Sequence, residues 1–221
     1  MRKAPGPPPP ALTISDAGAM EGGVATFSVS LSAASGKPVT VSYATAAGTA
    51  NTADFTAASG TLIFAPGETS KTIPVATTDD NIDEADQVFF VDLSSASNAT
   101  IADARGTGTI ADNDPLPQIS IDDVSVFEGA AGSTTPAVFN VTLSHPSESV
   151  ITVNFATSNQ TAQSGRDYEA ASGLVTFAPG QVSGQITVMI TGDKSKEGDE
   201  VFDVNLYGPT NATIALNVFG A

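Results

Sequence analysis

The sequence predicts an all-β protein that consists of two tandem antiparallel β-sandwiches. The first observation is an internal repeat, in which Ala65-Pro66-Gly67 recurs as Ala178-Pro179-Gly180 and Asn98-Ala99-Thr100-Ile101 recurs as Asn211-Ala212-Thr213-Ile214. Both pairs are displaced by 113 positions (178 − 65 and 211 − 98). This period exceeds the roughly 20 to 50 residues of stacking repeat units, so it indicates two domains of one fold. The second observation is an apolar period of two without sustained helical periodicity, which is typical of short strands.

The composition fits two such domains. The chain has 221 residues, and one domain commonly has roughly 100 to 200, so each half is long enough to bury a core. Its apolar residues are mainly Val, Ile, Leu and Ala, and Val, Ile, Thr and Phe suit half-buried strands. There is no cysteine, which excludes disulfides, thiolate metal sites and cysteine nucleophiles.

The charge excludes several kinds of partner. The formal net charge is −16 with only 8 Lys and Arg residues, whereas binding to nucleic acid phosphates requires clustered positive charge. No stretch approaches the roughly 18 consecutive apolar residues of a membrane span. We therefore expect no nucleic acid partner and no membrane insertion. The acidity has two interpretations: solubility in an extracellular or high-salt setting, or partial neutralisation by divalent cations.

The strands are expected between turn-forming residues. Residues 1–10 are rich in proline and lack the apolar run of a signal peptide, so they are predicted to be a linker. In the first copy we expect strands at residues 24–31, 39–44, 61–64, 73–77, 87–93 and 106–110. In the second copy we expect them at residues 138–143, 150–156, 174–177, 186–190 and 200–206. The intervening Pro66-Gly67 and Pro179-Gly180 fit the centre of a type II turn.

Two of these segments show which side chains face the core. Alternation places Phe89, Val91 and Leu93 on one face of the first copy. The displaced residues Phe202, Val204 and Leu206 lie on the matching face of the second. We expect about seven strands per copy and a shared core pattern.

Four motifs, each present in both copies, carry a resemblance to a known family. They are Glu21-Gly22 and Glu128-Gly129, then Asp54-Phe55 and Asp167-Tyr168, then Phe-Ala-Pro-Gly, then an acidic run before a Phe-containing strand. In this order they resemble the Calx-beta domain, known from sodium-calcium exchangers and large bacterial surface proteins. The resemblance covers about residues 12–114 and 117–221, and it implies an immunoglobulin-like sandwich that can bind calcium at one end.

The expected domain bounds follow from this resemblance. Residues 1–10 form the Pro-rich linker, residues 11–114 the first Calx-beta-like domain, residues 115–117 a short linker, and residues 118–221 the second domain. The implied calcium ligands of the first copy are Glu21, Asp54, Asp79, Asp80, the carbonyl of Ile82, Glu84, and the acidic run Asp112, Asn113 and Asp114. Calcium takes 6 to 8 oxygen ligands, which carboxylates from several loops can supply.

The second copy departs from the ligand pattern. The implied ligands are Glu128, Asp167, Asp193, the carbonyl of Ser195, Glu197 and Glu200. Gly192 stands where the first copy has Asp79, and Lys194 and Lys196 place ammonium groups inside the acidic loop, where they would compete with a cation. We expect this second site to be weaker or empty.

The second copy also lacks a match to its closing strand. The first copy has Gly106-Thr107-Gly108-Thr109-Ile110 followed by acidic residues, whereas the second reaches Ala221 where that strand would begin. We therefore expect a sandwich without its closing edge strand, which exposes unpaired backbone groups and an apolar slot. One explanation is an arbitrary boundary within a longer protein. The other is that a strand from a neighbouring molecule fills the slot, which would cause self-association.

These observations predict a calcium-binding structural or adhesive segment of a larger exported protein, located outside the cell or at its surface. The expected partners are calcium and neighbouring domains, and calcium near the short linker would rigidify the domain junction. An enzyme is the first alternative, but the single His145 precedes Pro146 in a predicted turn and no nucleophile motif is present. A protein- or carbohydrate-binding adhesion module without functional calcium is the other, and the absence of Trp disfavours sugar stacking.

Overall fold

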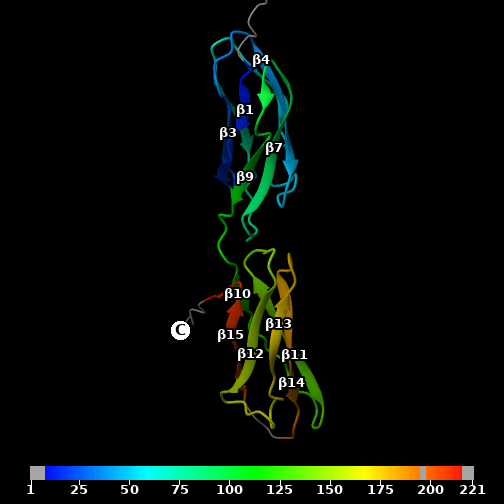
Figure 1. Ribbon diagram of the computed structural model, residues 1–221. Coiled ribbons are helices and arrows are strands. Elements are labelled where there is room, and N and C mark those ends of the chain that lie inside the picture. The colour runs from blue at the N-terminus through cyan, green and yellow to red at the C-terminus, as the bar shows by residue number, and fades with distance from the viewer. Residues whose placement is uncertain (1–7, 195–197, 216–221) are drawn as a thin grey trace, which may run out of the picture. The chain divides into compact units, whose positions relative to one another are not determined.

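The structure is a computed structural model that describes residues 8–194 and 198–215, and over these residues strands joined by turns and loops are the regular elements, without a helix (Figure 1). It divides into two compact units, one formed by residues 1–80 with 85–113 and the other by residues 81–84 with 114–221. No helix in the described part of the chain is long and apolar enough to cross a membrane. The predicted all-β class and the doubling of the fold are confirmed.

The first unit contains two sheets. One sheet has the strand order β6 (Ser70–Ala76), β3 (Val24–Leu31), β1 (Ala11–Ile14) and β8 (Thr100–Ile101). The other has the order β2 (Ala17–Met20), β9 (Arg105–Ala111), β7 (Gln87–Ser97), β4 (Val39–Ala47) and β5 (Ser59–Phe64). Neighbouring strands are antiparallel apart from the parallel pairs β1–β8 and β2–β9.

The second unit repeats this plan with fewer described strands. One sheet has the order β14 (Ser183–Thr191), β11 (Thr134–Leu143), β10 (Gln118–Ile121) and β16 (Thr213–Ile214). The other has the order β13 (Ser172–Phe177), β12 (Ile151–Asn159) and β15 (Phe202–Thr210). Among its described residues, the unit has no strand that corresponds to β2 or β9.

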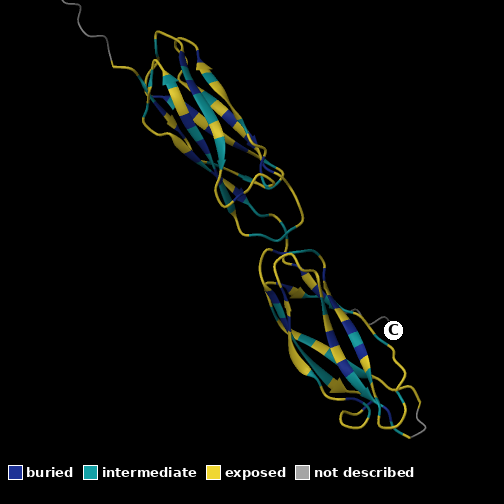
Figure 2. Ribbon diagram, turned by 90° about the vertical axis from the view of Figure 1, so that its right-hand side faces the viewer, coloured by how far each residue is buried: buried dark blue, intermediate teal, exposed yellow. Residues whose placement is uncertain are grey.

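Alternation along the strands places one apolar face of each sheet inside its sandwich (Figure 2). In β3 every second residue from Ala25 to Leu31 is buried, and the predicted inward set Phe89, Val91 and Leu93 of β7 is 0 to 5% exposed. Each unit has its own buried cluster. The core side chains predicted for the first copy are therefore correct.

The same aromatic arrangement occurs in both cores. Phe89 stacks on Phe55 with a centroid distance of 4.6 Å and meets the edge of Phe27 at 5.7 Å. In the second unit Phe202 stacks on Tyr168 at 4.4 Å and meets Phe139 at 6.0 Å. The repeat read from the sequence is thus also a repeat of core geometry.

The two Pro-Gly turns have the predicted conformation. Gly67 has a φ of 94° and Gly180 a φ of 77°, values that a type II turn requires at its third position. The backbone N–H of Glu68 donates to the carbonyl of Ala65 at 3.0 Å, and Gln181 donates to Ala178 at 2.9 Å. These turns connect β5 to β6 and β13 to β14, so in each unit the chain passes there from one sheet to the other.

Candidate metal centre

Three loops of the first copy bring acidic residues together, and each loop follows a strand. Glu21 follows β2, the segment from Thr77 to Asp80 follows β6, and Asp114 lies three residues after the end of β9. The parallel pairing of β2 with β9 sets Met20 opposite Ala111. Because these two strands end side by side, the residues that follow them begin from neighbouring positions.

The turn that carries Glu21 is fixed by backbone hydrogen bonds. The N–H of Glu21 donates to the carbonyl of Ala111 at 3.1 Å, and Gly22 has a φ of 68°, which a residue with a side chain rarely adopts. Thr77 accepts from the N–H of Gly23 at 2.9 Å and donates its hydroxyl to the carbonyl of Met20 at 2.8 Å. The buried Thr77 thus joins the loop of Glu21 to the loop of Asp80. The sequence pattern shows residue 77 only as part of an expected strand and does not reveal this role.

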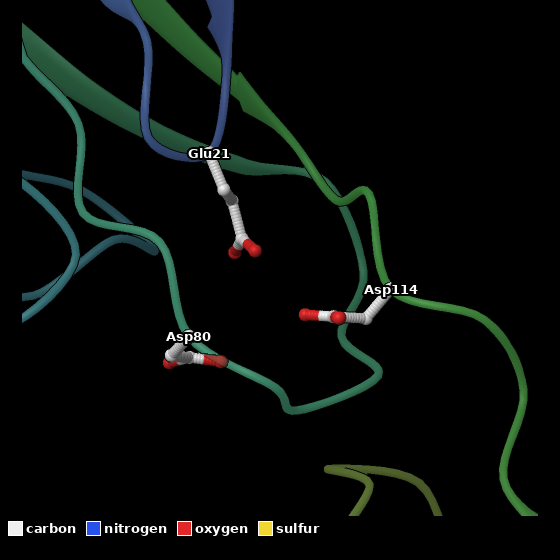
Figure 3. Close-up of side chains that lie close together, drawn as sticks. All are labelled: Glu21, Asp80 and Asp114. Atoms are coloured by element: carbon white, nitrogen blue, oxygen red, sulfur yellow. The ribbon is translucent and has the colours of Figure 1, made fainter.

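Glu21, Asp80 and Asp114 form a compact carboxylate group. One oxygen from each lies within 4.8 Å of the others, and Figure 3 shows the three side chains reaching into one space from separate loops. Glu21 and Asp114 are half-buried, whereas Asp80 is exposed. The residues come from positions 21, 80 and 114 of the sequence, so only the fold assembles them.

The spacing of these oxygens fits one calcium ion. Calcium binds oxygen at about 2.3 to 2.6 Å, so two ligands on opposite sides of one ion lie at most about 4.6 to 5.2 Å apart. A group in which all separations are within 4.8 Å satisfies this limit. The donor set contains carboxylate oxygen alone, which hard cations such as calcium prefer and which zinc or copper sites seldom use.

Some oxygens of the carboxylate group are shielded from water. Oε2 of Glu21 and Oδ2 of Asp114 are inaccessible to water. Burial of a carboxylate oxygen costs free energy unless hydrogen bonds or a cation compensate for the lost hydration. The burial also strengthens any interaction with a bound cation, because the effective dielectric constant is lower than in water.

Neighbouring side chains hold the loops around the group. The amide of Asn113 donates to the carbonyl of Glu21 and to Oδ1 of Asp79, both at 3.3 Å. Asp86 accepts from the N–H of Asp112 at 3.2 Å. Asn113 and Asp79 therefore support the first loop, and Asp86 anchors the acidic run. The repeat of Asp86 at Asp199 is a sequence signal that could have pointed to it.

Other predicted ligands of the first copy lie outside this group of three. Oδ2 of Asp54 accepts from the N–H of Asn51 at 2.6 Å, which closes its own short turn. The carbonyl of Asp54 accepts from the N–H of Thr78 at 2.8 Å, so this turn also braces the second loop. Glu84 is not a member of the carboxylate group. Glu84 and Ile82 both belong to residues 81–84, which are not part of the first compact unit. Their assignment as ligands stays a prediction.

In the second copy, the loop that follows Glu128 is longer than its counterpart. Six positions separate Glu21 from Phe27 (27 − 21), while eleven separate Glu128 from Phe139 (139 − 128). The two phenylalanines are equivalent, because Phe27 pairs with Ile73 and Phe139 with Ile186, which are displaced by 113 positions.

The extra residues fill the space beside Gly192. A Cβ atom at Gly192 would lie 2.3 Å from the carbonyl oxygen of Gly129 and 2.6 Å from that of Ala130. An aspartate like Asp79 therefore does not fit here, which gives a physical reason for the glycine. Within the described residues 114–194 and 198–215, no three acidic side chains gather as Glu21, Asp80 and Asp114 do.

The other predicted ligands of the second copy have different positions. Oδ2 of Asp167 accepts from the N–H of Gln163 at 2.7 Å, as Asp54 does in its own turn, and Arg166 lies 3.6 Å from Oδ1. Glu128 and Glu200 are exposed and Asp193 is half-buried. The predicted ligands Ser195 and Glu197 lie outside the described residues. A weaker second site stays a prediction.

Comparison with known proteins gives one family for both halves of the chain. Residues 17–115 and residues 117–218 each match the Calx-beta domain. The chain is 30% identical over 174 residues to the adhesion G-protein coupled receptor V1 of Danio rerio, a match that covers 69% of this chain and 3% of the receptor. It is 31% identical over 107 residues to sodium/calcium exchanger 1 of Bos taurus, covering 48% of this chain and 11% of the exchanger.

Two solved structures are also similar. One is described as CBD12 from CALX1.2, with 25% identity, a TM-score of 0.46, and coverage of 90% of this chain and 80% of that chain. The other is described as the calcium binding domain CBD12 of CALX1.1, with 24% identity, a TM-score of 0.46, and coverage of 90% and 79%. The chain spans only a small part of the curated relatives named above.

Proposed function

The chain belongs to the Calx-beta family, and on that premise we propose that its first domain binds calcium through Glu21, Asp80 and Asp114. The observation that carries this proposal is their convergence from three loops to within 4.8 Å. Calx-beta domains are binding and regulatory modules, so the function proposed for the chain is binding and not catalysis.

The repulsion among the three carboxylates supports the proposal. Two like charges 4.8 Å apart repel by about 1 kcal/mol in bulk water and by about 3.5 kcal/mol at an effective dielectric constant of 20. A divalent cation between them converts this repulsion into attraction. Asp54, Asp79, Glu84, the acidic run and water are the proposed sources of the remaining ligands, since calcium needs 6 to 8 oxygens.

Calorimetric titration with calcium tests this site. The wild-type chain should bind calcium, whereas Glu21→Gln and Asp114→Asn should each weaken the tightest binding by about tenfold or more, since each removes a charged ligand. Asp103→Asn is the matched control, because Asp103 is an exposed acidic residue of the same unit whose carboxylate accepts from the N–H of Arg105 at 3.3 Å. Equal affinities in the wild type and both site variants would contradict the assignment.

The position of Asp114 in the sequence links the cation to the chain that follows. Asp114 directly precedes Pro115-Leu116-Pro117, and two prolines in three residues make this segment stiff. A calcium ion bound by Asp114 would hold the start of the segment and thereby rigidify the domain junction. Small-angle scattering with calcium and with a chelator measures this effect. Identical scattering curves would count against it.

The module is proposed to be a structural or adhesive part of a larger exported protein. A net charge of −16 keeps an acidic surface soluble in an extracellular setting, where calcium is abundant enough for modules with a Kd of about 10⁻⁴ to 10⁻³ M. The chain covers only a small part of the length of its relatives, which is compatible with its being part of a larger protein. Protease treatment of intact source cells should cleave the protein. Full protection would contradict an extracellular location.

A further inference from the structure

One residue of the acidic run carries no charge. Asn113 stands between Asp112 and Asp114. Its side-chain amide nitrogen lies 3.3 Å from the carbonyl oxygen of Glu21 and 3.3 Å from Oδ1 of Asp79. This nitrogen has hydrogens to donate and accepts no hydrogen bond. Asn113 therefore presents N–H groups to two oxygens beside the candidate metal centre.

Both of these oxygens are of the kind that calcium binds. One is the backbone carbonyl of Glu21, whose carboxylate belongs to the carboxylate group, and the other belongs to Asp79, which directly precedes Asp80 of the same group. Backbone carbonyls and carboxylates are common protein ligands of calcium. An ion bound through the lone pairs that face Asn113 would meet the amide hydrogens, which carry partial positive charge. Asn113 thus competes with an ion for these lone pairs.

Two other acidic side chains in the surrounding loops also accept hydrogen bonds from the chain itself. Oδ2 of Asp54 accepts from the N–H of Asn51 at 2.6 Å, and Oδ1 of Asp86 accepts from the N–H of Asp112 at 3.2 Å. With Asp79, three carboxylates each use one oxygen for a donor of the protein. The members of the carboxylate group converge on one another instead (Figure 3). This division favours one ion, bound among the three converging side chains.

Charge determines whether a second ion can join the first. Two divalent ions repel one another about four times as strongly as two unit charges at the same distance, because the energy follows the product of the charges. A second calcium ion therefore needs additional carboxylates close by. An aspartate at position 113 would supply one beside Asp79. The asparagine has nearly the same shape but supplies N–H donors in place of a negative charge.

From these features we propose that Asn113 limits the first domain to a single calcium ion. The inference rests on the calcium binding proposed above and adds the number of ions. Asn113 acts through the two oxygens that its amide holds, those of Glu21 and Asp79, so in this role it is a positioning residue. Replacement by aspartate removes the donors and pairs two carboxylates, which creates a place for a second ion.

Counting the ions bound to the full chain tests the proposal. Native mass spectrometry gives the number of ions, and calorimetric titration gives their affinities. The double variant Glu21→Gln/Asp114→Asn reports the ions bound elsewhere in the chain, and subtraction gives the count for the first domain. This count should be about one in the wild type and rise by one in Asn113→Asp. The double variant Asn113→Asp/Asp79→Asn exchanges donor and acceptor without changing the total charge, so its count should return to that of the wild type.

Two further variants separate charge from structure. Asn113→Leu loses both donated hydrogen bonds without adding charge, so it should weaken calcium binding by about two- to tenfold and leave the count unchanged. Asn98→Asp is the matched control, because the exposed Asn98 also donates its amide to a carbonyl, that of Pro38 at 2.8 Å. Asn98 follows the last residue of β7, whereas Gln87 at the start of β7 pairs with Ile110 near the acidic run. This control should keep the wild-type count.

Thermal melts in chelator give a readout without calcium. Asn113→Asp should lower the Tm by about 4 °C or more through repulsion of Asp79, and the exchange variant Asn113→Asp/Asp79→Asn should recover it. A wild type that binds no calcium would remove the proposed function itself. Two ions at the wild-type first domain, an unchanged count in Asn113→Asp, or an extra ion in Asn98→Asp would overturn this inference and leave the proposed function in place. If Asn113→Asp does not fold, the wild-type count decides.

Discussion

Neutralising Glu21 should raise stability in chelator and lower the stabilisation that calcium provides. In Glu21→Gln the side chain keeps its size but loses its charge. Two repulsive pairs disappear, those with Asp80 and Asp114, whose oxygens lie within 4.8 Å. Because Asp80 is exposed, its pair with Glu21 contributes close to the bulk-water value of about 1 kcal/mol, whereas the pair of the half-buried Glu21 and Asp114 lies between this value and about 3.5 kcal/mol. Salt screening lowers both contributions, so the variant should gain about 1 to 2 kcal/mol in chelator.

Calcium should remove or reverse this advantage. At about 100 times its Kd, a ligand that binds only the folded state stabilises it by about 2.7 kcal/mol. The wild type should gain this amount, and the variant, whose Kd is about tenfold or more higher, should gain about 1.4 kcal/mol or less, because a charged ligand is missing. For a domain of this size, 1 kcal/mol corresponds to a Tm change of about 4 to 8 °C, so both shifts are measurable.

Scanning calorimetry in chelator and in saturating calcium measures the stability of both proteins. Hydrogen exchange at the amides of β2 and β9 assigns the effect to the first domain. Asp103→Asn serves again as the charge-matched control and should change neither effect. A variant that is less stable than the wild type in chelator, or one that gains as much from calcium, would refute the reasoning.

Three further substitutions test the packing and the loops. Gly108→Ala should destabilise the first domain by about 1 to 3 kcal/mol in urea denaturation, because the new Cβ would lie 2.4 Å from the buried ring of Phe89; an unchanged midpoint would contradict this packing. Gly22→Ala should lower the free energy of unfolding by about 1 to 2 kcal/mol in thermal melts, since Gly22 has a φ of 68°. The same substitution should weaken calcium binding in calorimetry, since the new Cβ would lie 3.0 Å from Cβ of Asp79; a variant with wild-type calcium affinity would argue against this second effect. Thr77→Val retains the shape of the side chain but loses its two hydrogen bonds, and should cost about 1 to 3 kcal/mol in urea denaturation; a neutral result would remove Thr77 as the tie between the loops.

The alternating core could be predicted from the sequence because its period is local. Phe89, Val91 and Leu93 are two positions apart, and a strand places such residues on one face whatever the tertiary structure. The Pro-Gly turns were predictable for the same reason. The parallel pairing of β2 with β9 was not, because both strands are short and their partners lie about ninety positions apart in the chain.

The ligand pattern of the candidate site was only partly predictable. Glu21, Asp80 and Asp114 were all named from the family resemblance, and the fold brings them together; Asp54 and Asp79 were named as well, and each uses one carboxylate oxygen in a hydrogen bond that shapes a loop, so their role as ligands stays a prediction. An acidic residue in a loop can serve either purpose, since a carboxylate accepts backbone N–H groups as readily as it binds a cation. The choice depends on three-dimensional spacing, which the sequence does not contain.

The parallel pairing of β2 with β9 determines how the first domain responds to mechanical tension. β2 lies near the start of the domain and β9 at its end, so a pull on the chain at both sides slides these strands past one another. The four registered pairs from Ala17–Gly108 to Met20–Ala111 are then loaded together and cannot open one by one. Glu21 directly follows β2 and Asp114 lies three residues beyond the end of β9, so a cation bound by both would resist this shear.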